Sequence, residues 1–241
     1  NAYGISQKYA ERLHIYFDYQ EENESIENID LAYKTKRKLE KITQSLNFVS
    51  RHQYLYSMIN EEIESLKKLV DTSKKLILVT GHRRENHGQG MINICEALRE
   101  ISATHKDVQI IYPVHLNPNV QKPVYEILGT QENIHLIDPL AYPAFVWLMN
   151  QSELIITDSG GVQEEAPSLG KPVLVIRDTT ERPEAVTQGT VLLVGTNTSK
   201  IVEQADRLLT DNTLYDTMST LHNPYGDGAA SEKIINYIKA L

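Results

Sequence analysis

The chain has 241 residues, of which 41% are hydrophobic, and its formal net charge is −8 at pH 7. This charge argues against a protein that holds nucleic acid through its overall field, while a local basic pocket for a small phosphorylated ligand is compatible with it. The apolar runs are far shorter than the roughly 20 residues that a membrane span needs, and no signal-peptide pattern opens the sequence. We therefore expect a globular, cytoplasmic protein that binds neither nucleic acid nor membrane.

Residues 1–74 contain almost no turn residues, because all nine prolines and eleven of the twelve glycines lie after Lys75. Apolar residues in this region recur at helical spacing, which predicts two or three helices. The acidic segment 21–30 is either a hinge between helices or a solvated helix start. We find no catalytic constellation here and predict an all-helical segment that docks on a partner or pairs in a homodimer.

From Lys75 onward, short β-rich runs alternate with helical patterns, which predicts one domain over residues 75–241. Six runs are typical of strands: 75–81, 108–114, 134–138, 154–157, 171–177 and 190–195. Helices are expected at about 91–104 and 119–128, around 144–150, from 162, and in two stretches near the end of the sequence. This alternation predicts an α/β fold, a Rossmann-like parallel sheet with helices on both faces, whose ligands bind beyond the carboxyl ends of the strands.

The single cysteine, Cys95, permits no internal disulfide and no thiolate metal cluster. It falls inside the helix expected at 91–104, in an apolar-periodic run. We predict that it is a small buried helix residue, and no metal site is expected.

The first candidate loop is VTGHRREN, where a predicted strand ends in glycine and is followed by His82, Arg83 and Arg84. A guanidinium group offers a planar fork for phosphate oxygens, and a nearby anion would favour a protonated histidine that donates to a leaving phosphate. The alternative is a surface cluster of salt bridges. The density of cations at the predicted ligand edge favours anion binding.

The second candidate loop is LIITDSGGVQEEA, in which Ser159, Gly160 and Gly161 form a tight turn before a helix. Glycines let backbone N–H groups approach a phosphate closely, and a helix start favours negative charge. The motif is neither a GxGxxG sequence nor a P-loop. Of the following acids, Glu164 and Glu165, one could complement the helix dipole while the other accepts hydrogen bonds from a ribose diol. A nucleoside diphosphate fits both features.

Two further residues are candidates with open alternatives. Arg182 precedes Pro183 in VIRDTTERPEA, and the proline would stiffen its setting near a ligand, although the segment could equally be a solvated loop. Phe145 in IDPLAYPAFVWLMN is a candidate for stacking on a base. Core packing is the more common outcome for such an aromatic residue.

The stretches VTGHRREN, YPVHLNPNV, TDSGGVQEEAPSLGKPVL, RDTTERPEAV and HNPYGDG occur in this order. From about Lys74 to Ile238 the chain resembles the carboxyl-terminal half of the non-hydrolysing UDP-N-acetylglucosamine 2-epimerases. The resemblance implies the second half of the two-domain GT-B architecture, which many nucleotide-sugar glycosyltransferases share, with UDP held mainly by this half. It implies UDP or UDP-GlcNAc as the ligand and no cofactor.

The resemblance also implies residue roles. UDP-binding positions are the diphosphate turn, the ribose carboxylate, the uracil neighbour and one further arginine: Ser159, Gly160, Gly161, Glu165, Phe145 and Arg182. His82 matches a histidine near the phosphates that matters for catalysis. Arg83 and His115 match positions that in some members touch a second, activating UDP-GlcNAc, so both are candidate allosteric residues. Leu140 stands where relatives carry glutamine, so local nucleotide contacts are expected to differ.

The family's reaction removes UDP by elimination across C1 and C2 of the sugar and returns it after protonation on the other face, interconverting UDP-GlcNAc and UDP-ManNAc for polysaccharide synthesis. The resemblance places the acid/base carboxylates in the first domain. Residues 1–74 show no GTRPE-like, HGD-like or VEAGLR-like segment. We therefore predict a UDP-binding half joined to an unrelated helical segment, an isomerase by family whose chemistry this chain alone does not complete. The alternatives are a non-catalytic UDP-sugar-binding module and half of a GT-B glycosyltransferase.

Overall fold

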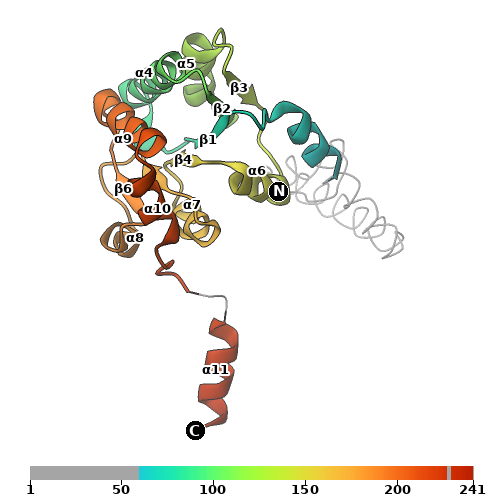
Figure 1. Ribbon diagram of the computed structural model, residues 1–241, viewed down its shortest axis with the longest axis vertical. Coiled ribbons are helices and arrows are strands. Elements are labelled where there is room, and N and C mark those ends of the chain that lie inside the picture. Colours follow the sequence, from blue (N-terminus) through green and yellow to red (C-terminus); the bar gives the residue numbers. More distant parts are fainter. Residues whose placement is uncertain (1–59, 227–228, 241) are drawn as a thin grey trace, which may run out of the picture. The chain divides into compact units, whose positions relative to one another are not determined.

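The computed structural model describes residues 60–226 and 229–240 (Figure 1). The chain divides into two compact units, Asn1–Lys67 with Ala141–Ala144, and Lys68–Leu140 with Phe145–Leu241. Residues 60–69 are helical, as the sequence analysis expects for this part of the chain. The other helices expected before residue 60 lie outside the described residues, and the domain boundary at residues 74 and 75 stays a prediction.

Six parallel strands form one sheet in the order β3-β2-β1-β4-β5-β6. The strands are β1 (Lys75–Thr80), β2 (Val108–Pro113), β3 (Ile134–Ile137), β4 (Leu154–Thr157), β5 (Val173–Val175) and β6 (Val191–Leu193). Every residue of β4 and β5 is buried, as expected for parallel strands that are covered on both faces. The predicted α/β fold with six parallel strands is confirmed.

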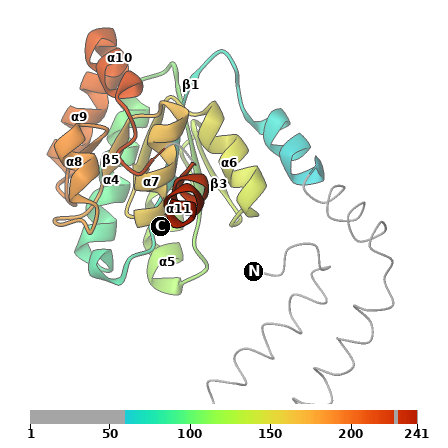
Figure 2. The same ribbon diagram turned by 90° about the horizontal axis from the view of Figure 1, so that it is seen from below.

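Helices cover both faces of this sheet (Figures 1 and 2). One layer holds α4 (Gln89–Thr104), α5 (Pro118–Leu128) and α9 (Thr198–Thr210), and the other holds α7 (Gly160–Glu165) and most of α6 (Tyr142–Gln151). The apolar stripe of α4 includes Ile94 and Leu98, which share one core cluster with Ile77 and Ile110 of the sheet. α4 therefore packs directly on the central strands and closes the core on this face of the sheet.

The remaining described elements are short or lie near the end of the sequence. They are η1 (Arg84–Asn86), η2 (Ala166–Leu169), α8 (Pro183–Gln188), α10 (Asn212–Thr220) and α11 (Ala230–Lys239). The sequence analysis treated the start of α8 as a charged loop, but Pro183 takes the first helical position, where a missing N–H costs nothing. From residue 198 the structure has three helices, α9 to α11, where two stretches were expected. None of the helices in this described part of the chain is long and apolar enough to cross a bilayer.

Cys95 lies in α4 and is fully buried, so the prediction of a small buried helix residue is confirmed. Desolvation by the surrounding core raises the pKa of its thiol to about 12, with a smaller contribution from the nearby charge of Glu96.

The strand order reverses between β1 and β4. These two strands pair through Thr80 and Thr157, whose hydroxyl oxygens lie 2.6 Å apart. The chain leaves β1 toward β2 and leaves β4 toward β5, so the loops that follow the two strands diverge. Such a reversal opens a crevice at the carboxyl ends of the strands, where ligands of open α/β sheets bind. The segment HRREN, which follows β1, and the segment DSGG, which follows β4, therefore begin side by side at this crevice.

Candidate functional site

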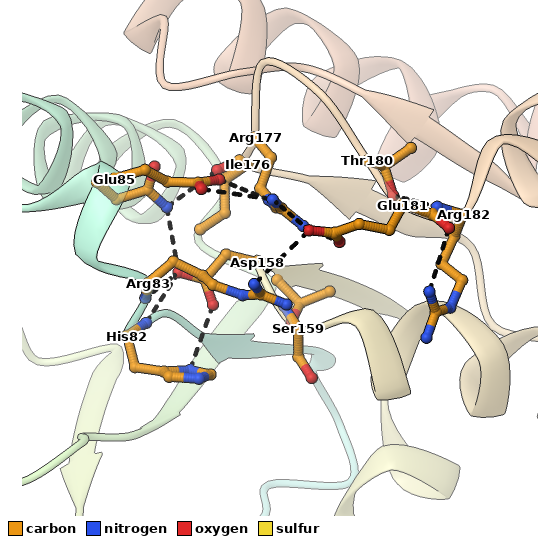
Figure 3. A network of polar contacts seen from close by, with 12 residues as sticks. His82, Arg83, Glu85, Asp158, Ser159, Ile176, Arg177, Thr180, Glu181 and Arg182 are labelled. Carbon is orange, nitrogen blue, oxygen red and sulfur yellow. Dashed lines mark hydrogen bonds and ion pairs between the residues drawn. The ribbon is translucent and has the colours of Figure 1, made fainter.

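A buried carboxylate joins the two loops at the strand reversal. Asp158, which follows β4, is 0% exposed. Its Oδ2 accepts hydrogen bonds from the backbone N–H groups of His82 and Arg83, at 2.9 and 2.8 Å, and from the side-chain amide of Asn86 at 3.1 Å (Figure 3). Asp158 therefore holds the loop after β1 in place over the end of β4. The sequence analysis gave no site role to Asp158 or Asn86.

Two histidines from the loops that follow the neighbouring strands β1 and β2 stack at the mouth of this site. The rings of His82 and His115 have centroids 5.3 Å apart and planes inclined by 19°. Nδ1 of His82 lies 3.3 Å from Oδ1 of Asp158, and the His82 side chain is 43% exposed. Desolvation lowers the pKa of His115, and the charge of His82 lowers it further. The structure thus brings a candidate catalytic residue and a candidate allosteric residue into direct contact.

The glycine turn after β4 lies beneath two guanidinium groups. A Cβ built on Gly160 would have Nη2 of Arg83 and Nη2 of Arg182 as its nearest neighbours, both at 3.8 Å. The backbone N–H of Ser159 donates to the Thr157 hydroxyl at 2.9 Å, which fixes the start of the turn. α7 has only six residues, and the two guanidinium groups add formal positive charges near the positive end of its dipole.

Carboxylates partly neutralise these arginines. Arg182 forms an ion pair with Glu164. The carboxylate of Glu164 therefore interacts with an arginine rather than with the dipole at the start of α7. Arg83 lies 3.9 Å from Glu181, with both side chains well exposed to solvent. Oε1 of Glu165 lies 3.8 Å from the position of a Cβ on Gly161. The acid proposed for ribose recognition is therefore next to the turn.

Arg177 links the loop after β1 to the loop after β5. Its side chain is 5% exposed and reaches Glu85 at 2.6 Å and Glu181 at 2.5 Å. Hydrogen bonds from Arg177 lower the pKa of Glu181 to about 2, and both carboxylates hold the pKa of Arg177 above its ordinary value. The sequence analysis missed Arg177, although its position at the carboxyl end of a predicted strand was a usable signal.

Phe145, the predicted uracil neighbour, and Leu140, which stands where relatives carry glutamine, have no part in this polar network. Phe145 is half-buried in α6, and Leu140 is half-buried shortly before that helix. Half-burial is compatible both with stacking on a base and with packing at the edge of a core. The assignment of Phe145 to uracil stays a prediction.

A separate cavity of about 640 Å³ lies where α9 begins, lined by residues that include Asn93, Asp178, Thr196 and Lys200. It shares Arg177 with the polar network but not the glycine turn or His82. We give more weight to the strand reversal than to the size of this cavity, because the reversal brings together the cations and the turn. Among residues 60–226 and 229–240, no group of three or more His, Cys, Asp or Glu is placed to hold a metal ion.

The sheet order, the strand reversal and the cationic turn define a class of protein. They are those of a Rossmann-like domain, the second half of a GT-B fold, with two guanidinium groups gathered at its switch point. The model of the UDP-N-acetylglucosamine 2-epimerase family matches residues 36–239. The chain belongs to this family.

Relatives with high sequence identity carry the same family name. The chain is 61% identical over 181 residues to the UDP-N-acetylglucosamine 2-epimerase of Escherichia coli O157:H7, covering 75% of this chain and 48% of that protein. It is 64% identical over 170 residues to the Yersinia pestis enzyme, covering 70% and 45%. The structure of the Neisseria meningitidis enzyme bound to UDP-GlcNAc matches with a TM-score of 0.71 and 43% identity, covering 87% of this chain and 53% of that one.

Two facts follow from the extent of these matches. The chain spans about half the length of the curated relatives that it matches. The family match begins at residue 36, within the segment 1–74 that the sequence analysis treated as unrelated to the family. Residues 36–74 are therefore similar to the family as well, which the sequence analysis did not recognise.

Proposed function

We propose that this chain carries the UDP-binding half of a UDP-N-acetylglucosamine 2-epimerase. The observation that supports this most directly is the convergence of Arg83 and Arg182 over Gly160, each 3.8 Å from the position of an added Cβ. Two guanidinium forks above a backbone that has no side chain suit the oxygens of a diphosphate. A relative from Neisseria meningitidis was solved with UDP-GlcNAc bound, which agrees with this class of ligand.

In this proposal the nucleotide lies along the switch point. The turn Ser159–Gly161 and Arg182 hold the diphosphate, Glu165 accepts hydrogen bonds from the ribose diol, and Phe145 lies beside the uracil. A diphosphate would replace carboxylates as the partner of the arginines, because Arg182 is paired with Glu164 and Arg83 lies near Glu181.

The reaction that we propose for the whole enzyme is elimination followed by re-addition. A base removes the proton on C2, the bond between C1 and the UDP oxygen breaks, and UDP leaves a 2-acetamidoglucal. Protonation of C2 on the opposite face and return of UDP to C1 give UDP-ManNAc. This chain would stabilise the departing diphosphate through His82, Arg83 and Arg182, since charge develops there in the transition state. The acid/base groups at C2 belong, in this proposal, to a part of the enzyme outside this half.

The test is calorimetric titration of the chain with UDP, comparing the wild type with Gly160→Ala. Apart from the adjacent backbone, the added methyl group would meet the guanidinium groups of Arg182 and Arg83 at 3.8 Å, which is ordinary contact. The variant should therefore fold, while the methyl group fills space needed by the diphosphate. We expect the affinity for UDP to fall by at least about tenfold. The matched control is Gly90→Ala, where the new Cβ meets Thr196 at 3.4 Å and UDP affinity is expected to stay unchanged. Absence of UDP binding to the folded wild type would disprove the proposal.

A second candidate is a module that binds UDP-sugars without turnover, which the two cations over the glycine turn would support equally well. Proton NMR with UDP-GlcNAc in deuterated water separates the two. Exchange at C2 with formation of UDP-ManNAc, lost in His82→Ala, would show that this chain completes the reaction and exclude the second candidate. Ligand-induced shifts without exchange support a binding half. Homodimerisation and a cytoplasmic location remain parts of the proposal to be tested.

A further inference from the structure

We propose that Asp158 is a positioning residue that selects the ring tautomer of His82, keeping the proton on Nδ1 and leaving Nε2 for the diphosphate. This inference rests on the proposed function for its catalytic meaning, but its structural part can be tested without a ligand. It concerns a carboxylate to which the sequence pattern gives no site role.

The two oxygens of the Asp158 carboxylate have unequal surroundings (Figure 3). Oδ2 accepts three hydrogen bonds, from the backbone N–H groups of His82 and Arg83 and from the side chain of Asn86. Oδ1 is buried and accepts no hydrogen bond from the described residues, yet it lies 3.3 Å from Nδ1 of His82. A buried carboxylate oxygen that lacks a donor is costly. A small rotation of the imidazole supplies the donor, provided that Nδ1 carries the proton.

The opposite tautomer is disfavoured by elementary electrostatics. With the proton on Nε2, the lone pair of Nδ1 would face a buried carboxylate oxygen, and neither atom could donate. Other contacts limit the ways in which the ring could turn to avoid this. The backbone of His82 is bound to the same carboxylate, and its ring stacks on that of His115. Asp158 therefore fixes both the loop that carries His82 and the edge of the imidazole that faces the protein.

The catalytic consequence lies on the other edge of the ring. When Nδ1–H points to Asp158, Nε2 is the free ring nitrogen of a side chain that is 43% exposed. Protonated His82 then donates from Nε2 to a phosphate oxygen of the departing UDP, while the carboxylate stabilises the imidazolium. This division of labour is the one that a buried aspartate performs for histidine in hydrolase triads. In those enzymes an asparagine in place of the aspartate preserves geometry and reverses the tautomer.

The same substitution gives a sharp test here. In Asp158→Asn, the amide oxygen must take the place of Oδ2 to keep its three donors, so the amide NH₂ takes the place of Oδ1 and donates to Nδ1 of His82. Long-range proton–nitrogen NMR on histidine-labelled protein at about pH 9, where imidazoles are neutral, reports the tautomer directly. We expect Nδ1–H in the wild type and Nε2–H in the variant. His82→Ala identifies the signals by their loss.

The matched control is Asp206→Asn. Asp206 lies 3.1 Å from Nε2 of His105 in a more exposed aspartate–histidine pair, and its change should leave the His82 signals unaltered. An Nε2–H tautomer of His82 in the wild type would overturn the proposal. That measurement needs no variant, so the proposal stays testable even where Asp158→Asn does not fold.

A titration with UDP separates this inference from the proposed function. We expect Asp158→Asn to bind UDP at least about fivefold more weakly than the wild type at about pH 6, because the amide that donates to Nδ1 disfavours the imidazolium of His82. The variant then offers the diphosphate an uncharged Nε2–H in place of a charged one. Equal affinity together with a reversed tautomer would overturn the positioning role. If the wild type shows the Nδ1–H tautomer but no UDP binding, the proposed function fails while the tautomer assignment holds.

Discussion

Arg177 binds Glu181 through two nitrogen–oxygen contacts, at 2.5 and 3.0 Å, from a guanidinium group that is nearly buried. The same arginine reaches Glu85 in the loop after β1. Glu181 directly precedes Arg182, one of the two cations above the glycine turn. Arg177 therefore ties together the two loops that place Arg83 and Arg182, although it is not itself one of the cations over Gly160.

We predict that Arg177→Met lowers the free energy of unfolding by about 2 kcal/mol, since it removes charged hydrogen bonds to two carboxylates that remain accessible to water. UDP affinity should fall several-fold, because the loop that carries Arg182 is no longer fixed. Urea denaturation and calorimetry measure the two effects. The control is Arg99→Met on the surface of α4, where an exposed pair with Glu96 contributes little. Equal urea midpoints for the two variants would contradict the proposal that Arg177 stabilises the protein by linking these two loops.

Glu181 also predicts a pH dependence of stability. Hydrogen bonds from Arg177 lower the pKa of this carboxyl from 4.5 to about 2. A carboxyl whose pKa is depressed by folding stabilises the protein above its unfolded pKa and loses that contribution as the pH falls toward the folded value. This stabilisation should be lost as the pH is lowered from 4.5 to about 2. Its size should decrease in high salt, because Glu181 is exposed to solvent. Thermal unfolding of Glu181→Gln should be less sensitive to pH in this window, whereas an unchanged profile would speak against the ion pair.

The glycine turn gives a third prediction. Ser159→Ala combined with Gly161→Val should lower UDP affinity by more than about tenfold, since a hydroxyl donor is lost and the close approach of the backbone is blocked. A Cβ on Gly161 meets Glu165 and Ser159 at 3.8 and 3.9 Å in the native chain, which is ordinary contact. The double variant should therefore fold, and circular dichroism checks this. Unchanged affinity in the folded variant would place the phosphate site elsewhere.

The strands and their parallel arrangement were predictable, because strands buried on both faces leave continuous apolar runs in the sequence. The residues of β1 from Leu76 to Val79 are all buried. The pairing of Asp158 with the loop of His82 was not predictable in this way. These residues are 76 positions apart, and only the order of the strands brings them together. A pattern along the chain reports local periodicity but carries no record of which strand lies beside which.

The missed features share a physical cause. Arg177 looked like one charge among many in RDTTERPEA, and its burial depends on carboxylates from two loops. The start of α8 was hidden because Pro183 reads as a helix breaker unless it is recognised as a first helical residue. In contrast, the turn from Ser159 to Gly161 was predicted from its two adjacent glycines, and the structure places Arg182 next to it. The role of these residues in binding UDP stays a prediction.

The contact between His82 and His115 gives a fourth prediction. Desolvation lowers the pKa of His115 below its ordinary value of 6.5, and the charge of His82 contributes next, while Asp158 opposes both. His82→Ala removes one positive charge but not the desolvation, so the pKa of His115 should rise toward 6.5 without fully reaching it. Titration of the ring protons by NMR measures this. A fall in the pKa of His115 would mean that stacking on His82, rather than repulsion by it, governs this residue.

The buried thiol of Cys95 gives the last prediction. The core around α4 leaves Cys95 0% exposed, and desolvation raises its pKa to about 12, so neither access nor thiolate is available near neutral pH. Ellman's reagent should not react with the native chain at about pH 8 and should react with one thiol after denaturation in urea. Because labelling requires opening of the core, its rate should rise in Arg177→Met if that variant lowers global stability. Rapid labelling of the folded wild type would show that α4 does not pack on the sheet as the structure has it.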